Sequence, residues 1–181
     1  MEFGLYRLCP ESYCNKMISL NHYGGTAMNI GIVVYSQTGN TLAVVQQLRD
    51  KLKAQGHTVA IERITLASDP KDAKNIRLNS LPGLREYDAL VFAAPVQGFQ
   101  LCPPMRAYLM MMPPLMGRKA AVLVTKHWAS GWTGGSSAIK EIGKAIEANG
   151  GRLAGEGFIG WKSKRREWDI EELTESIAAR F

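Results

Sequence analysis

Residues 30–56, IGIVVYSQTGNTLAVVQQLRDKLKAQG, contain the pattern that decides the fold. Their first six residues form a continuous apolar run, which is typical of a parallel strand buried on both faces. From Thr41 to Gln55 the apolar residues recur at helical spacing, and Gly56 follows as a C′ glycine does. These apolar positions are Leu42, Val45, Leu48 and Leu52. The polar residues between the two patterns are therefore predicted to join a buried strand to an amphipathic helix.

The same alternation continues to the C-terminus. Further strands are predicted at residues 58–66, 89–94, 120–125 and 153–161, and further helices at residues 104–112, 136–149 and 169–179, the last capped by Asp169. Residues 69–87 are polar and fit either a short helix or a loop. The alternation predicts an α/β fold: a doubly wound five-stranded parallel sheet with helices on both faces. Ligands bind at the carboxyl ends of such strands, so the loops after Tyr35, Ala94 and Thr125 are expected to carry function.

The composition fits one globular domain. The chain has 181 residues, of which 46% are hydrophobic and 21% charged, and this balance excludes a disordered chain, collagen and a disulfide scaffold. No apolar run reaches the roughly 18 residues of a membrane span, so no membrane partner is expected. The three cysteines and three histidines are too scattered for a zinc-type cluster, and no metal is expected. An odd cysteine count is explained most simply by a reducing compartment, so we expect a cytoplasmic protein.

Residues 1–27 differ from the rest because they show no clear apolar period. They also lack the basic start and the continuous apolar core of a signal peptide. Two interpretations remain. The segment is either an artefact, from an early start codon or a vector-derived leader, or a genuine arm that packs on the domain or on a partner. In both cases the domain is expected to span residues 28–181.

The first predicted loop has the chemistry of a phosphate cradle. Its residues are Ser36, Gln37, Thr38, Gly39, Asn40 and Thr41. Short polar side chains donate hydrogen bonds, Gly39 permits a tight turn, and the following helix offers amide groups and a positive dipole end. The loop has no lysine, so it is not the P-loop of nucleotide triphosphatases. The alternative is a polar turn in which Asn40 caps the helix.

The stretch YSQTGNT after a first strand resembles the phosphate loop of the flavodoxins, with the pattern [ST]-x-T-G-x-T. The resemblance covers about residues 28 to 181 and fits the short-chain members of that family. It implies a flavodoxin-like fold that binds flavin mononucleotide (FMN), with the phosphate held by Ser36, Thr38, Asn40 and Thr41.

The second loop is similar to the flavodoxin loop that touches the flavin ring. It contains Pro95, Val96, Gln97, Gly98 and Phe99. Gly98 would permit a backbone rearrangement near the ring, and Phe99 would supply an aromatic face. The family pattern places its aromatic residue before the glycine, whereas Phe99 follows it. Packing of Phe99 in the core is therefore an equal alternative.

The third loop occupies the position of the other flavin-contacting loop of the flavodoxins. The residues expected to bind the cofactor there are Thr125, Lys126, His127, Trp128, Gly131 and Trp132. Two tryptophans in a glycine-rich loop are unusual, and one of them would cover a face of the ring. The alternative is that both tuck under the loop. Lys126 or His127 would neutralise the reduced flavin, or would be solvated loop residues.

Two further motifs have simpler interpretations. Residues 155–160, GEGFIG, match G-x-G-x-x-G, but they lie inside a predicted strand with no helix directly behind them, which disfavours a dinucleotide site. The basic cluster at residues 162–166 is either a solvated turn or a docking patch for an acidic partner or a nucleotide phosphate. The net charge is +6, but no recognised nucleic-acid motif accompanies it, so nucleic acid is not an expected partner.

Three functions remain open on these patterns. The favoured one is an FMN-binding electron-transfer protein that acts with a redox protein partner or a small-molecule acceptor. The second is an NAD(P)H-dependent FMN reductase acting on quinones or similar acceptors. The third is a flavin-free binding or regulatory domain, which the intact phosphate loop disfavours. The resemblance implies an acidic carrier, whereas this chain is basic, and no residue is assigned a catalytic role.

Overall fold

A computed structural model of the chain describes residues 26–68, 75–127 and 134–181. Five parallel strands form the sheet, in the order β2-β1-β3-β5-β6. They are β1 (Asn29–Val34), β2 (Thr58–Arg63), β3 (Ala89–Gln97), β5 (Lys119–Lys126) and β6 (Arg152–Gly160). The helices are α2 (Asn40–Ala54), α3 (Pro103–Met110), α4 (Gly135–Ala148) and α5 (Arg166–Ala178). The predicted doubly wound five-stranded sheet is confirmed.

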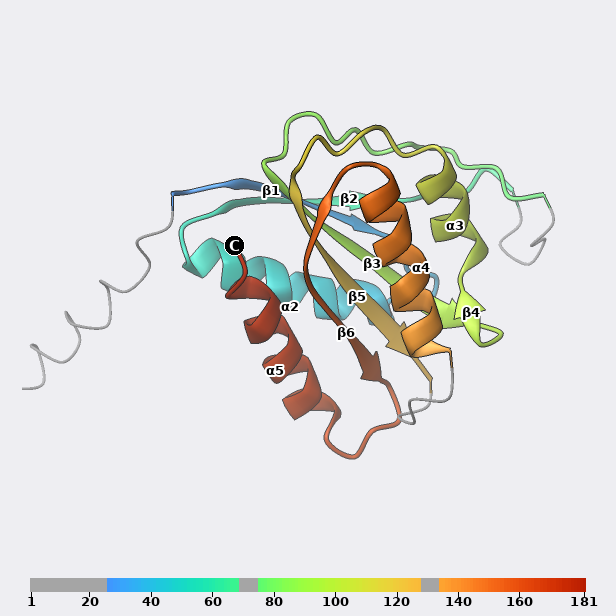
Figure 1. The fold of residues 1–181 in the computed structure, drawn as a ribbon. Coiled ribbons are helices and arrows are strands. Elements are labelled where there is room, and N and C mark those ends of the chain that lie inside the picture. The colour runs from blue at the N-terminus through green and yellow to red at the C-terminus, as the bar shows by residue number, and fades with distance from the viewer. Residues whose placement is uncertain (1–25, 69–74, 128–133) are drawn as a thin grey trace, which may run out of the picture.

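The helices cover the sheet in two pairs, with α2 and α5 on one face and α3 and α4 on the other (Figure 1). Each face has its own apolar core. The first core contains Leu48 and Leu52 of α2 with Ile170 and Ile177 of α5. The second contains Tyr108 of α3 with Ile139 and Ile142 of α4. Because both faces are covered, the central strands are apolar without alternation.

The strand β3 is longer than predicted. The sequence places residues 95–100 in a loop, but residues 95–97 continue the strand, and Val96 pairs with Leu101 in the short antiparallel strand β4 (Gln100–Leu101). Pro95, which has no amide hydrogen, lies just beyond the end of the β1–β3 pairing at Ala93, and its carbonyl accepts from the Cys102 amide at 3.3 Å. The second predicted loop is therefore the end of a strand and a tight hairpin.

The predicted cap of the last helix is wrong. The last helix begins at Arg166, and Asp169 lies in its first turn, where its carboxylate accepts a hydrogen bond from Ser163 Oγ at 2.7 Å. Of the two alternatives for residues 69–87, the described part, residues 75–87, forms a loop and no helix, and Leu78 there bridges Leu66. Polar sequence without a helical apolar period explains why a loop results.

The middle glycine of the G-x-G-x-x-G match, Gly157, serves packing in β6. A Cβ at Gly157 would collide with Leu173 of α5, so the glycine allows the helix to approach the sheet. This contact agrees with the interpretation of the motif as part of a strand and not as a dinucleotide site.

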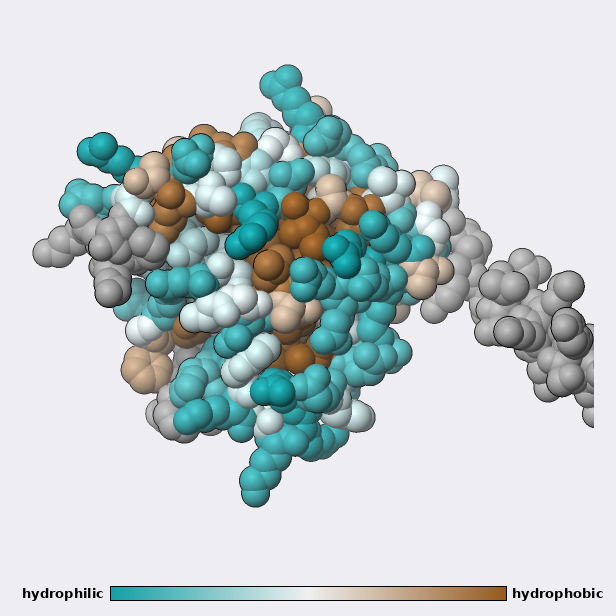
Figure 2. Space-filling model, turned by 180° about the vertical axis from the view of Figure 1, so that it is seen from behind, coloured by the Kyte–Doolittle hydropathy of each residue, from teal (hydrophilic) through white to brown (hydrophobic). Residues whose placement is uncertain are grey.

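The surface opposite to the view of Figure 1 is largely hydrophilic, with hydrophobic residues reaching the surface near its centre (Figure 2). Among the helices in the described ranges, none is long and apolar enough to cross a membrane. Over the same ranges, His, Cys, Asp and Glu side chains do not gather in threes as metal ligands do. Cys102 is buried, and burial raises the pKa of its thiol to about 12, so the thiol stays protonated near neutral pH.

Candidate functional site

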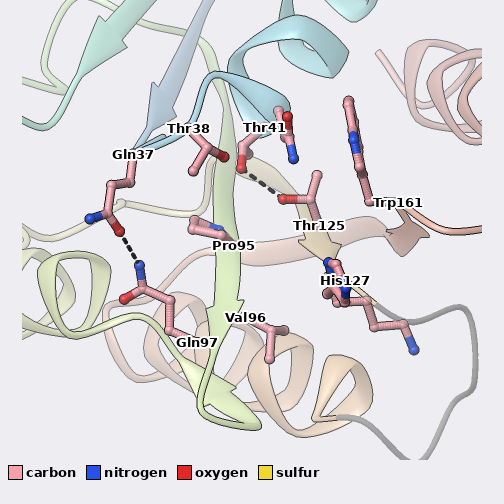
Figure 3. Close-up of a pocket in the computed structure, with 11 residues that line it drawn as sticks. Gln37, Thr38, Thr41, Pro95, Val96, Gln97, Thr125, His127 and Trp161 are labelled. Carbon is pink, nitrogen blue, oxygen red and sulfur yellow. Dashed lines mark hydrogen bonds between the residues drawn. The ribbon is translucent and has the colours of Figure 1, made fainter.

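A cavity of about 220 Å³ lies at the carboxyl ends of β1, β3 and β5 (Figure 3). The residues that line it are Gln37, Thr38, Asn40, Thr41, Pro95, Val96, Gln97, Thr125, Lys126, His127 and Trp161. All of them except Trp161 are predicted site residues. The structure therefore brings the described parts of the three predicted segments around one cavity.

The turn between β1 and α2 has features that can receive an anion. Gly39 is the N-cap residue, with a φ of 89°, so the alternative in which Asn40 caps the helix is wrong. A Cβ added at Gly39 would meet nothing within 4 Å, which shows open space beside the turn. The first amides of a helix have no acceptors within it, and the helix dipole places positive charge at this end. Space, donors and charge together fit a phosphate group.

Ser36 stabilises this turn through a side-chain hydrogen bond to the start of α2. Its Oγ accepts a hydrogen bond from the Leu42 amide at 3.2 Å, which satisfies one of the amides at the start of α2. The hydroxyl proton of Ser36 is not used in that bond, so it stays available as a donor. Ser36 thus holds the turn together and keeps a proton that it can donate.

A buried pair of hydroxyls joins the first and third segments. Thr41 Oγ1 of α2 and Thr125 Oγ1 of β5 lie 2.7 Å apart, and each side chain is almost fully buried. A threonine hydroxyl has one proton and two acceptor positions. If Thr125 donates to Thr41, then the Thr41 proton can be donated into the cavity that both residues line.

The first and second segments meet at the rim of the cavity. Gln97 Nε2 at the end of β3 donates to Gln37 Oε1 at 2.8 Å (Figure 3). Both side chains are exposed or nearly so, and the bond closes the turn against the hairpin. The first segment is therefore linked to the third through Thr41 and to the second through Gln37.

Lys126 forms part of the cavity wall although only 3% of it is exposed. Its Nζ lies 3.6 Å from the centroid of the Phe158 ring, a cation–π contact. The side chain packs on Gly135 at the start of α4, where an added Cβ would be 3.1 Å from Lys126 Cδ. Burial lowers the pKa of this ammonium group. The alternative of a solvated loop residue is wrong for Lys126, because β5 continues through it and pairs with Gly160.

Replacement of Lys126 by methionine is expected to change how stability depends on pH. A lysine with a pKa below its ordinary 10.5 in the folded state binds fewer protons there than in the unfolded state. The native chain should therefore gain stability as the pH rises from the lowered pKa toward 10.5, and Lys126→Met should not show this gain. Urea unfolding at about pH 7 and about pH 10 measures this gain in stability. Tyrosine ionisation contributes equally to both proteins, so the difference between them reports Lys126 alone. A Lys140→Met control on exposed α4 should behave as the native chain; equal pH dependence in all three would contradict the prediction.

Trp161 is the lining residue that the sequence analysis missed. It directly follows β6, and its amide donates to the Lys126 carbonyl at 2.7 Å. The predicted strand 153–161 included Trp161, which hid its place at the carboxyl edge. Its position just after a strand end, where functional loops begin in such sheets, is the signal that could have identified it.

Gly98 and Phe99 form the tip of the β3–β4 hairpin and are not among the lining residues. Both have positive φ, 55° and 64°, as a two-residue hairpin of this kind requires. Phe99 is 65% exposed, so the alternative in which it packs in the core is wrong. Its carbonyl group rests against Gly134, at the N-terminus of α4. Stacking of Phe99 on a ligand stays a prediction.

The remaining predicted residues of the third loop, Trp128, Gly131 and Trp132, lie outside the described residues. His127 is exposed and borders the cavity, and its carbonyl accepts from the Lys162 amide at 3.0 Å. The described start of the third segment thus consists of the end of β5 and His127.

The solved structures that the chain resembles are flavodoxins and related flavoproteins. A flavodoxin of Streptococcus pneumoniae TIGR4 is 20% identical, with 84% of this chain and 99% of that chain covered and a TM-score of 0.61. Flavodoxin 2 of Bacillus cereus is 18% identical, with 86% and 100% covered and a TM-score of 0.60. A flavoprotein of Lactobacillus acidophilus NCFM, solved in complex with FMN, is 15% identical, with 82% and 99% covered and a TM-score of 0.57.

The chain has the flavodoxin-like fold. By contrast, no protein-family model and no curated protein matches the sequence. In this flavodoxin-like domain the phosphate-compatible turn, the β3–β4 hairpin and the end of β5 border one cavity. The arrangement can hold an anionic group at α2 and leaves Pro95, Val96 and His127 to contact whatever is attached to it.

Proposed function

We propose that the chain binds FMN in this cavity and transfers electrons through it. The observation that carries the proposal is the turn at residues 36–41, which offers open space, hydroxyl groups and the N-terminus of α2 beside the cavity. The flavodoxin-like fold supports it, because the solved structures with this fold include a flavoprotein in complex with FMN.

The residues of the turn have the donors that a phosphate requires. Ser36, Thr38, Asn40 and Thr41 would hold it together with the first amides of α2. Thr125 would orient the Thr41 hydroxyl through their 2.7 Å hydrogen bond. When bound, FMN supplies the redox chemistry, and the chain supplies binding, orientation and electrostatics.

The flavin ring would contact the other side of the cavity. Pro95 and Val96 at the end of β3 offer apolar surface, and Trp161 offers an aromatic face. Lys126 places a cation in the wall, and positive charge there favours the more negative, reduced form of a bound redox group. We therefore expect Lys126 to raise the reduction potential of the bound flavin.

Titration with FMN tests the proposal directly. Binding should shift the visible absorption of FMN and quench its fluorescence, and riboflavin, which lacks the phosphate, should bind much more weakly because the turn at residues 36–41 would have no anion to hold. FMN that gives neither shift nor quenching at high micromolar concentration would sink the proposal. Equal affinity for riboflavin would remove the role of the turn.

Anaerobic addition of NADPH then separates electron carriage from reductase activity. A carrier that relies on a partner protein should keep its flavin oxidised over the time of mixing. Prompt bleaching of the flavin band would instead show a reductase, and the electron-carrier part of the proposal would fall.

A further inference from the structure

We propose that the basic–aromatic surface, residues 161–168, docks an acidic face of a partner protein at the mouth of the cavity. The proposal rests on the proposed electron transfer, for which a partner must approach the cavity closely. The surface comprises the whole β6–α5 connection and the first three residues of α5, with the sequence WKSKRREW.

The surface is fastened to the cavity wall by backbone hydrogen bonds. The Trp161 amide donates to the Lys126 carbonyl at 2.7 Å, and the Lys162 amide donates to the His127 carbonyl at 3.0 Å. Trp161 itself lines the cavity. A protein that binds this surface therefore lies next to the cavity and not at a distant part of the domain.

The charge of the surface is strongly positive. The surface has four basic residues and one acidic residue. The basic residues are Lys162, Lys164, Arg165 and Arg166, and the acidic residue is Glu167. Glu167 pairs with Arg166 at 2.7 Å, while Lys164 and Arg165 are exposed to solvent. Such a field attracts an oppositely charged protein surface and speeds its association.

Two cation–π contacts order the side chains of this surface. The Arg165 guanidinium lies 3.9 Å from the centroid of the Trp168 ring, and that of Arg166 lies 4.9 Å from the Trp161 ring. Trp168 is 51% exposed, a large apolar area at the surface. Tryptophan and arginine are the residues most enriched among those that dominate binding energy at protein interfaces. Prior ordering of the arginines also reduces the entropy lost on binding.

The acidic residues of the first turn of α5 favour a protein over a small phosphate ligand. Glu167 and Asp169 both lie in that turn, where they already complement the helix dipole. A compact phosphate at this helix end would meet both carboxylates. A protein face spreads its carboxylates over a wide area. These carboxylates can pair with Lys164 and Arg165 without coming close to Glu167 or Asp169.

The test measures binding of a fluorescein-labelled deca-glutamate peptide to the full chain by anisotropy, at about 20 mM and about 200 mM salt. Lys164→Glu/Arg165→Glu should weaken binding at low salt at least tenfold. The control Lys140→Glu/Lys144→Glu changes the net charge equally but lies on exposed positions of α4, which packs on the opposite face of the sheet from α5. Its effect should be threefold or less, and higher salt should weaken binding to the native chain and the control.

Equal losses in the two double variants would overturn the proposal, because net charge alone would explain binding. It would also be overturned if adenosine 2′,5′-bisphosphate bound this surface and the peptide did not, since the surface would then be a nucleotide-phosphate site. The peptide assay uses the chain with and without FMN. Failure of FMN to bind therefore refutes the proposed function separately from the peptide result.

A kinetic measurement connects the surface with electron transfer. In the chain loaded with FMN and reduced by dithionite, oxidation by the anionic ferric complex of EDTA should slow as salt rises. Oxidation by the cationic cobalt(III) tris-phenanthroline complex should accelerate. Lys164→Glu/Arg165→Glu should reduce the preference for the anionic oxidant at least threefold more than the α4 control does. An unchanged preference would show that partners do not approach through this surface.

Discussion

Replacement of both Thr38 and Thr41 by valine is expected to weaken FMN binding by roughly 10²- to 10⁴-fold. Each valine keeps the shape of threonine but removes a hydroxyl that would donate to the phosphate. A hydrogen bond to a charged group contributes about 1.5–3 kcal/mol, and two such bonds give the expected range. Fluorescence quenching of FMN measures the affinity, and unchanged affinity would refute the assignment of the phosphate site.

The matched control is Thr38→Ser/Thr41→Ser, which keeps both hydroxyls and should lose less than about tenfold. Thr41→Val also leaves the buried Thr125 hydroxyl without its partner at 2.7 Å. We therefore expect the valine protein to be less stable by about 1–3 kcal/mol. Urea unfolding of the FMN-free proteins measures this cost, so a loss of folded protein can be separated from a loss of phosphate contacts.

Gly134→Ala is expected to destabilise the domain by about 2–5 kcal/mol. Gly134 has a φ of 80°, which costs an alanine about 1–2 kcal/mol. The added Cβ would also collide with the carbonyl group of Phe99, so either the hairpin or the start of α4 must move. The Cβ is fixed directly to the backbone at residue 134, and the carbonyl belongs to the backbone of Phe99. Rotation of a side chain therefore cannot relieve the contact.

The control for this variant lies at the other end of the same helix. Gly150 has a similar φ of 74°, but a Cβ there would meet nothing within 4 Å. Gly150→Ala should therefore cost only about 1–2 kcal/mol, the part due to backbone conformation. Chemical denaturation of both variants measures the difference. A difference near zero would show that the hairpin does not rest on α4 in solution.

Periodicity predicted the elements of the sheet because each central strand is buried on both faces and each helix on one. The apolar run at residues 30–35 and the spacing of residues 41–55 therefore contain the information that burial requires. The ends of the strands are different, because pairing with neighbours decides them. Pro95 to Gln97 remain in β3 because β4 and β5 supply partners, and no local pattern reveals those partners.

The sequence predicted those parts of the candidate site that depend on their position directly after a strand. The turn at residues 36–41 was found because short polar residues, a glycine and a helix start follow a buried strand. The Thr41–Thr125 pair could not be foreseen, because its members are 84 residues apart and meet only through the strand order. Trp161 was missed because it lies at the boundary of β6, and boundaries are the least reliable part of an interpretation based on periodicity.

The long sequence separation of Thr41 and Thr125 also ties the cavity to the folding reaction. A contact of this separation requires closure of a long loop, so it forms only when α2 and β5 are docked on the same sheet. An unfolded chain has no such cavity and would not compete for the cofactor. FMN at one hundred times its dissociation constant would therefore add about 2.7 kcal/mol to the free energy of unfolding. Supply of the proposed cofactor would thereby shift the balance between folded and unfolded chain toward the folded state.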